Sequence, residues 1–262
     1  MTIFWHEWRS NWRSFLIWSL SLGLFVLTIV LIFPEMQKSM GEMDELFANM
    51  GGFTAAFGLQ HLSMSDPLGY YALENGTVLA IGGGFFAAFL GTGMLAKEEG
   101  RHSAEFLLTL PLSRLQVALE KLLAQVTQII ALNLICYGMG FGSLLLISTE
   151  FDYRNLFLLH LALTVLMLQV GLFCFGLSAF MRESSLGLGI GLTLALYLLN
   201  MLINLQPDWS GLRFLTPFAF SEPSRILPEG SLEWPIAVST GLISSFLLGV
   251  GLAYYSRKDI AI

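Results

Sequence analysis

The chain has 262 residues, of which 55% are hydrophobic and only 12% carry a charge. Soluble domains carry a charge on about 25% of their residues, so this chain has too few charges to cover the surface of a soluble enzyme. Its net charge of −6 also argues against a nucleic-acid-binding surface, which needs an excess of cations. The composition therefore indicates a membrane protein.

Six long segments without a charged residue follow one another along the chain. About 20 residues of helix cross a hydrocarbon core about 30 Å thick, and every segment reaches this length. The sequence predicts an all-α membrane protein with six transmembrane helices, in which residues 1–262 form a single domain. The spans are expected at about residues 15–34, 76–96, 122–148, 156–181, 184–206 and 235–255.

A seventh uncharged segment, residues 46–65, is not predicted to span the bilayer. It contains Asn49, Gln60, His61 and a pair of glycines, and these polar groups are costly in lipid. An external segment and a re-entrant segment both fit this composition.

The distribution of cations predicts the topology. With six spans and a cytoplasmic N-terminus, nine of the 13 Lys and Arg residues fall on the cytoplasmic side. Cytoplasmic loops carry an excess of Lys and Arg. We therefore expect a multi-pass protein of the plasma (inner) membrane with both termini in the cytoplasm.

The residues before the first span predict a helix at the lipid headgroups. Residues 3–14 are charged throughout and lack the apolar core of a signal peptide. Trp5, Trp8 and Trp12 recur at helical spacing, which places the three indole rings on one face. Such a face suits an interfacial helix in contact with membrane lipid. The alternative is the first turns of the first span.

Polar residues and glycines inside the spans have two interpretations. The amides at Gln125, Gln128, Asn133, Gln169, Asn200 and Asn204 either form helix–helix hydrogen bonds or line a substrate path. Small residues recur at Gly83, Ala87 and Gly91, and at Gly187 and Gly191, a spacing that predicts close helix packing. Cys136 and Cys174 lie in mid-span as apolar thiols, and their spacing predicts no metal site.

The link between the second and third predicted spans, residues 97–121, is dense in charge. Glu98, Glu99 and Glu105 precede an apolar run, Pro111 is expected to end one helix, and Ser113 can cap the next. By itself this pattern is also typical of a solvated linker.

This link resembles a stretch found in the permeases of type-2 ATP-binding-cassette (ABC) exporters. The resemblance rests on Glu98-Glu99-Gly100, Glu105, Leu107-Leu108, Pro111-Leu112-Ser113-Arg114 and Lys121. The layout of six spans behind an N-terminal interfacial helix, and the tail over residues 255–260, are similar as well.

The resemblance implies that the link forms a cytoplasmic coupling helix, which docks on a separately encoded ATPase subunit. The residues implied in coupling are Glu98, Glu99, Gly100, Glu105, Phe106, Leu107, Leu108, Pro111 and Arg114. The chain has no G-x-x-x-x-G-K-[ST] loop, so no cofactor is expected in it, and ATP and magnesium belong to the partner.

The implied function is that of a non-catalytic permease subunit, which dimerises with a second copy or a paralogue. The resemblance implies outward transport. No span carries a charge, which favours an amphipathic peptide, a drug or a lipid-like molecule as the cargo. One alternative is a channel or membrane scaffold that works without an ATPase. Another is an intramembrane metalloprotease built on Glu98, Glu99 and His102, with His160 on the far side of the membrane.

Overall fold

The computed structural model describes residues 2–37, 52, 56, 62, 65–97, 112–147 and 150–258. Nearly all of the segment 46–65 lies outside these residues. So do Glu98, Glu99, Gly100, Glu105, Phe106, Leu107, Leu108 and Pro111, so the coupling helix stays a prediction.

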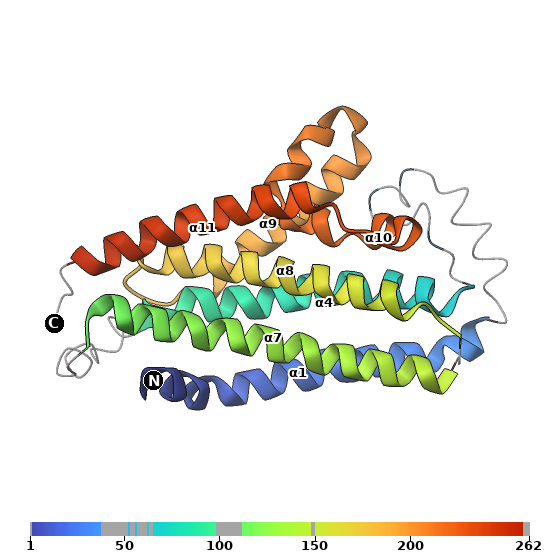
Figure 1. Cartoon of the computed structure of the whole chain (residues 1–262), viewed down its shortest axis with the longest axis horizontal. Helices are drawn as coiled ribbons and strands as arrows, with labels where there is room; N and C mark the ends of the chain where they lie inside the picture. The colour runs from blue at the N-terminus through green and yellow to red at the C-terminus, as the bar shows by residue number, and fades with distance from the viewer. Residues whose placement is uncertain are drawn as a thin grey trace.

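Six helices in the described part of the chain are long and apolar enough to cross a membrane, as predicted. They are α1 (Thr2–Met36), α4 (Pro67–Met94), α7 (Arg114–Ile147), α8 (Tyr153–Ser178), α9 (Leu186–Leu205) and α11 (Trp234–Arg257). Figure 1 shows that α9 leaves the bundle at an angle, whereas α1, α4, α7, α8 and α11 run along it. The described residues contain helices and connections and no strand, so the all-α class is confirmed.

Helix starts are set by caps, which the charge pattern did not reveal. The α4 helix begins at Pro67 rather than near 76, because the Asp66 carboxylate accepts a hydrogen bond from the backbone N–H of Gly69. Ser113 caps α7, as expected, in a reciprocal pair with Gln116. Both helices therefore begin before the uncharged segment, and they include the charged residues Glu74 in α4 and Arg114 in α7.

The predicted helix over residues 3–14 is present, but it is not a separate element. It continues without a break into the span as the first part of α1. Trp5 and Trp12 are exposed, whereas Trp8 packs against Phe15 and its indole N–H donates to the Thr127 hydroxyl on α7 at 3.0 Å. Packing against α7 thus turns one of the three indoles toward the protein.

The centre of the bundle is the pair α4 and α8, which contain the largest buried shares among the six helices. Their contact depends on small residues. A Cβ added to Gly91 would lie 2.7 Å from the carbonyl oxygen of Gly171, and one added to Gly83 would overlap the Met167 side chain. The close packing predicted around Gly83 and Gly91 is confirmed.

The residues between α9 and α11 form a packed segment rather than an open loop. Two 3₁₀ helices, η2 (Pro207–Leu215) and η3 (Pro217–Ser221), are followed by the short helix α10 (Pro223–Glu229). All five residues of η3 are buried, and the chain turns out of α10 at Gly230, which has a positive φ of 58°. Burial of η3 brings the chain back into the bundle between α8, α9 and α11.

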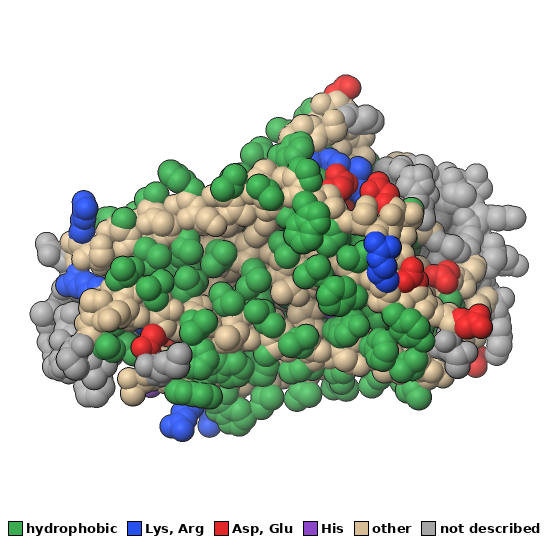
Figure 2. Space-filling view, viewed as in Figure 1, with side chains coloured by type: hydrophobic (Ala, Val, Ile, Leu, Met, Phe, Trp, Pro, Cys, Tyr) green, Lys and Arg blue, Asp and Glu red, His purple; other side chains and the backbone are tan. Residues whose placement is uncertain are grey.

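The two ends of the bundle differ in what meets there. The end of α4, the starts of α1 and α7, and the end of α11 come together at one end, called the terminal end here (Figure 1). The α10 helix lies at the opposite end. Between them, Figure 2 shows a broad band of hydrophobic side chains across the visible face, as a lipid-facing surface requires.

Candidate functional site

Three charged side chains meet inside the terminal end of the bundle. The Glu7 carboxylate on α1 accepts from Lys121 Nζ on α7 at 2.8 Å and from Lys97 Nζ just beyond α4. Lys121 also donates to the carbonyl oxygen of Met94 at 2.9 Å. The side chains of Lys121, Glu7 and Lys97 are 0%, 1% and 17% exposed. We call these three residues the ion cluster.

The ion cluster joins three helices through one carboxylate. Ion pairs exposed to water contribute little to stability, but a desolvated carboxylate needs its cations and hydrogen bonds to remain buried. Glu7 has two such cations, one from the end of α4 and one from two turns inside α7. The relative position of α1, α4 and α7 at this end is therefore fixed by directional contacts as well as by packing.

Neighbouring contacts hold the same end together. The Glu120 carboxylate accepts from the backbone N–H groups of Ile3 and Phe4 at 3.0 and 3.1 Å, so α7 supplies the cap of α1. Arg114 donates to the carbonyl oxygen of Lys258 at the end of α11. Arg114, the one predicted coupling residue that the structure describes, thus links α7 to α11.

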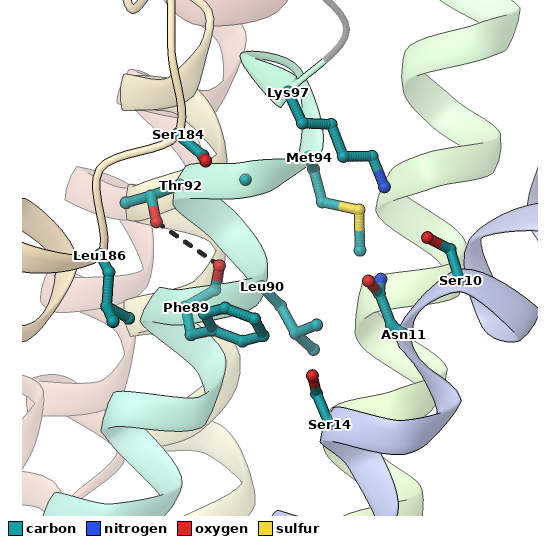
Figure 3. Close-up of a pocket in the computed structure, with 11 residues that line it drawn as sticks. Ser10, Asn11, Ser14, Phe89, Leu90, Thr92, Met94, Lys97, Ser184 and Leu186 are labelled. Carbon is teal, nitrogen blue, oxygen red and sulfur yellow. Dashed lines mark hydrogen bonds between the residues drawn. The ribbon is translucent and has the colours of Figure 1, made fainter. Parts of the chain in front are cut away.

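A cavity of about 250 Å³ lies beside the ion cluster. Its wall combines polar groups with apolar side chains from α1, α4 and the connection between α8 and α9. Figure 3 shows Lys97 extending from the end of α4 toward Ser10 and Asn11 on α1. The residues that line it are Ser10, Asn11, Ser14, Phe89, Leu90, Thr92, Gly93, Met94, Lys97, Ser184 and Leu186.

Gly189, in the first turn of α9, lies against α4 next to the cavity residue Thr92. A Cβ on Gly189 would lie 3.2 Å from both the Ala88 carbonyl oxygen and the Thr92 methyl group, so a larger residue would fit only if its neighbours on α4 shifted by a few tenths of an ångström. Gly187 and Gly191 behave differently, because no described atom lies within 4 Å of a Cβ added to either. Their predicted close packing therefore has no partner among the described residues of this chain.

Two of the predicted path residues form hydrogen bonds between helices. The Gln169 amide donates to the Ala237 carbonyl oxygen on α11 at 2.7 Å and accepts from Thr240 at 2.8 Å. Asn133 on α7 donates to the Thr164 hydroxyl on α8 at 2.8 Å and to the carbonyl oxygen of His160 at 3.1 Å. The helix–helix interpretation describes what these two residues do in the structure.

His160 joins Asn133 in a buried chain of hydrogen bonds. The Tyr71 hydroxyl lies 2.7 Å from His160 Nε2, and His160 Nδ1 lies 2.6 Å from the Asn133 side-chain oxygen. A neutral ring with its proton on Nδ1 satisfies both contacts, because the hydroxyl then donates to Nε2. We call Tyr71, Asn133, His160 and Thr164 the neutral network.

The remaining predicted path residues lie in two places. Gln125 and Gln128 are buried on α7, and their amide atoms have no hydrogen-bond partner among the described residues. Asn200 and Asn204 line a pocket of about 40 Å³ between α4, α9 and η3. There the Asn204 amide donates to the buried Glu222 carboxylate, which also pairs with Arg225 at 3.1 Å. The six residues therefore do not line one common cavity.

The ion cluster is what the sequence reasoning missed. The tryptophan spacing assigns no partner to Glu7, and the third span predicted at residues 122–148 leaves Lys121 in the link before it. A signal was present, because Ile3, Glu7, Phe15 and Ser19 follow the helical step along one buried face of α1. That step predicts a buried carboxylate, which in turn requires cations from another helix.

Comparison with known families agrees with this architecture. Residues 1–212 match the family described as ABC-2 family transporter protein. The chain belongs to this family. No curated protein matches the sequence. As an ABC-2 transporter protein, the chain is a multi-pass membrane permease subunit, a type of subunit that is generally non-catalytic and works with an ABC ATPase.

The match covers α1, α4, α7, α8 and α9 in full. The ion cluster and every residue that lines the cavity of the ABC-2 permease lie within it.

Proposed function

We propose that the chain is the transmembrane subunit of an ATP-driven exporter, which acts as a dimer coupled to separate ATPase subunits. The whole chain serves as one permease domain, with the terminal end and both termini in the cytoplasm of the cell and the ATPases bound there. The ATPases hold the ATP and magnesium. The cargo is an amphipathic peptide, a drug or a lipid-like molecule that moves outward.

The cavity beside the ion cluster is the observation that carries this proposal. Its wall offers hydroxyl and amide groups from Ser10, Asn11 and Thr92 next to apolar groups from Phe89 and Leu90, a combination that suits an amphipathic molecule. Sites that enclose a drug-sized ligand measure about 300–1,000 Å³, so about 250 Å³ amounts to part of such a site. A second copy would supply the rest.

The surface of α9 supports dimerisation. This helix exposes Leu194, Leu198 and Leu202, and it carries Gly187 and Gly191 with open space around them. Small residues four positions apart let a neighbouring helix approach closely within the membrane. Since α9 begins at the cavity, a contact between two copies through α9 would bring their cavities together.

Topology is tested by labelling single cysteines in a background with Cys136→Ala and Cys174→Ala. Glu183→Cys lies in the connection before α9, and Ser231→Cys lies beyond α10. A membrane-impermeant maleimide added to whole cells should label Ser231→Cys alone. Labelling of Glu183→Cys from outside would contradict the proposed orientation.

Transport is tested with the chain and the ABC ATPase that co-purifies with it, placed together in vesicles. We expect ATP-dependent movement of a fluorescent amphipathic peptide, and no movement with a non-hydrolysable ATP analogue. Uptake that needs no ATPase would instead favour the channel alternative. For the dimer, Gly187→Leu should lower the dimer fraction, with Gly211→Leu, which is also in open space but lies in η2 outside the spans, as the control.

A further inference from the structure

We propose that the ion cluster transmits movement of the inner ends of α4 and α7 to α1 and the cavity, with Lys97 as the positioning residue. This inference rests on the proposed function, because it assigns a route for the ATPase stroke inside the permease. It concerns Glu7, Lys97 and Lys121, and all three lie in the described part of the chain.

The first argument is the position of the two lysines in the chain. Lys97 lies three residues after Met94, the last residue of α4, and Lys121 lies seven residues after the first residue of α7. The chain between these helices is the part that the family resemblance assigns to the ATPase contact. Both sides of that connection are therefore joined to a single carboxylate on α1, and neither can shift without pulling on Glu7 or breaking a buried contact.

The second argument is that Lys97 is part of both the ion cluster and the cavity wall. Its ammonium contacts Glu7, and its side chain also lines the cavity opposite Ser10 and Asn11 (Figure 3). A displacement of Lys97 therefore changes the cavity wall directly. The same displacement acts on α1 through Glu7, one and two turns before the cavity residues Asn11 and Ser14.

The third argument is that the contact is desolvated and directional. Lys121 is fully buried and also bonded to the Met94 carbonyl oxygen, so it cannot exchange Glu7 for water without leaving the interior. A contact of this kind has a few discrete arrangements, which is the property needed to couple one helix to another. An exposed ion pair would yield to solvent instead.

The experiment uses the complex with its ATPase and two reporter cysteines, in a background with Cys136→Ala and Cys174→Ala. Leu112→Cys reports on the start of α7, and Ser14→Cys reports on the cavity. The measurement is the rate of labelling by a charged maleimide, taken without nucleotide and with ATP and vanadate. In the parent complex we expect both rates to change with nucleotide.

The deciding variant is Lys97→Met, which leaves the balanced pair of Glu7 and Lys121 in place. We expect the nucleotide-dependent change at Ser14→Cys to fall by about threefold or more, since the cavity no longer follows the ATPase, while the change at Leu112→Cys persists. Lys97→Arg should restore the response at Ser14→Cys. Glu120→Gln is the matched control, because Glu120 also joins α7 to α1 but caps a helix instead of pairing with Lys97.

A second variant removes both partners of the fully buried pair and leaves only the partly exposed Lys97 without its carboxylate. Glu7→Leu combined with Lys121→Leu should give the same loss at Ser14→Cys and the same retained response at Leu112→Cys. An unchanged response at Ser14→Cys in either variant would overturn the inference. Failure of both variants to bind the ATPase would overturn it too, because the cluster would then serve folding or assembly.

The parent complex separates the two proposals. If neither reporter responds to nucleotide, or no ATPase binds, the proposed function fails. If Leu112→Cys responds and Ser14→Cys does not, the ATPase contact stands and the route through the ion cluster is wrong.

Discussion

The ion cluster and the neutral network are both buried and polar, and each joins three secondary-structure elements, but they differ in chemistry. The ion cluster holds one carboxylate between two ammonium groups beside a cavity. The neutral network connects Tyr71, His160 and Asn133 through uncharged donors and acceptors, each of which has a partner. The stability of the ion cluster depends on pairing opposite charges, and the stability of the neutral network depends on hydrogen-bond geometry.

This difference indicates different uses of buried polarity in one bundle. Uncharged networks between helices stabilise one arrangement at modest cost in an apolar environment. Buried charges add little net stability, and removing one partner is costly, so their presence calls for a role beyond packing. The location of the ion cluster at the cavity and at the ends of α4 and α7 is consistent with such a role.

The largest effect is expected from Glu7→Gln. This change leaves Lys121 buried without an opposite charge, and we expect the free energy of unfolding to fall by about 3–5 kcal/mol. The measurement is reversible unfolding in mixed micelles with increasing SDS. Glu120→Gln keeps an oxygen that can accept from Ile3 and Phe4 and removes only the charge at the start of α1, so it should cost about 0.3–1 kcal/mol. If Glu7→Gln and Glu120→Gln lowered the free energy of unfolding equally, the buried charge of Glu7 would contribute no more to stability than the charge of Glu120.

A smaller loss is expected from Tyr71→Phe in the neutral network. His160 Nε2 then loses its donor in the interior, which costs about 1–3 kcal/mol in the same measurement. Tyr70→Phe is the matched control. Among the described residues, the Tyr70 hydroxyl donates only to the Met36 sulfur, a weak acceptor, at 3.5 Å. If Tyr70→Phe lowers the free energy of unfolding as much as Tyr71→Phe does, the neutral network does not stabilise the bundle.

Within the ion cluster, Lys97→Met is expected to lower the free energy of unfolding by about 1 kcal/mol. Glu7 keeps Lys121, and the Lys97 side chain is already 17% exposed, so less desolvated charge is left behind. Lys121→Met should be clearly more damaging, because Lys121 is fully buried and also bonds the Met94 carbonyl oxygen. The comparison would fail if both lysine variants unfolded at the same SDS fraction.

The smallest effect is expected from Thr164→Val. Asn133 keeps its hydrogen bond to the His160 carbonyl oxygen, so we expect a loss of about 0.5 kcal/mol. The shape of the side chain is nearly unchanged, which separates the hydrogen bond from packing. A loss as large as that of Tyr71→Phe would show that the Thr164 hydroxyl is essential to the network.

The sequence by itself determined the class of protein and the number of spans. Runs of about 20 apolar residues are long enough to cross a bilayer whatever they pack against, so each of the six segments predicts its own helix. The same local reasoning found the cap at Ser113 and the close packing at Gly83 and Gly91. It also found the family through one short stretch and the layout of the chain.

Only the tertiary structure decided which polar residues meet. Glu7 and Lys121 are 114 positions apart, and no local pattern relates a residue in α1 to one in α7. The packed segment from η2 to α10 lies between the fifth and sixth predicted spans, where the sequence predicts no element, and its burial depends on the space that α8, α9 and α11 leave between them. Spans follow from the solvent that surrounds each helix, whereas buried contacts follow from how the helices pack against one another.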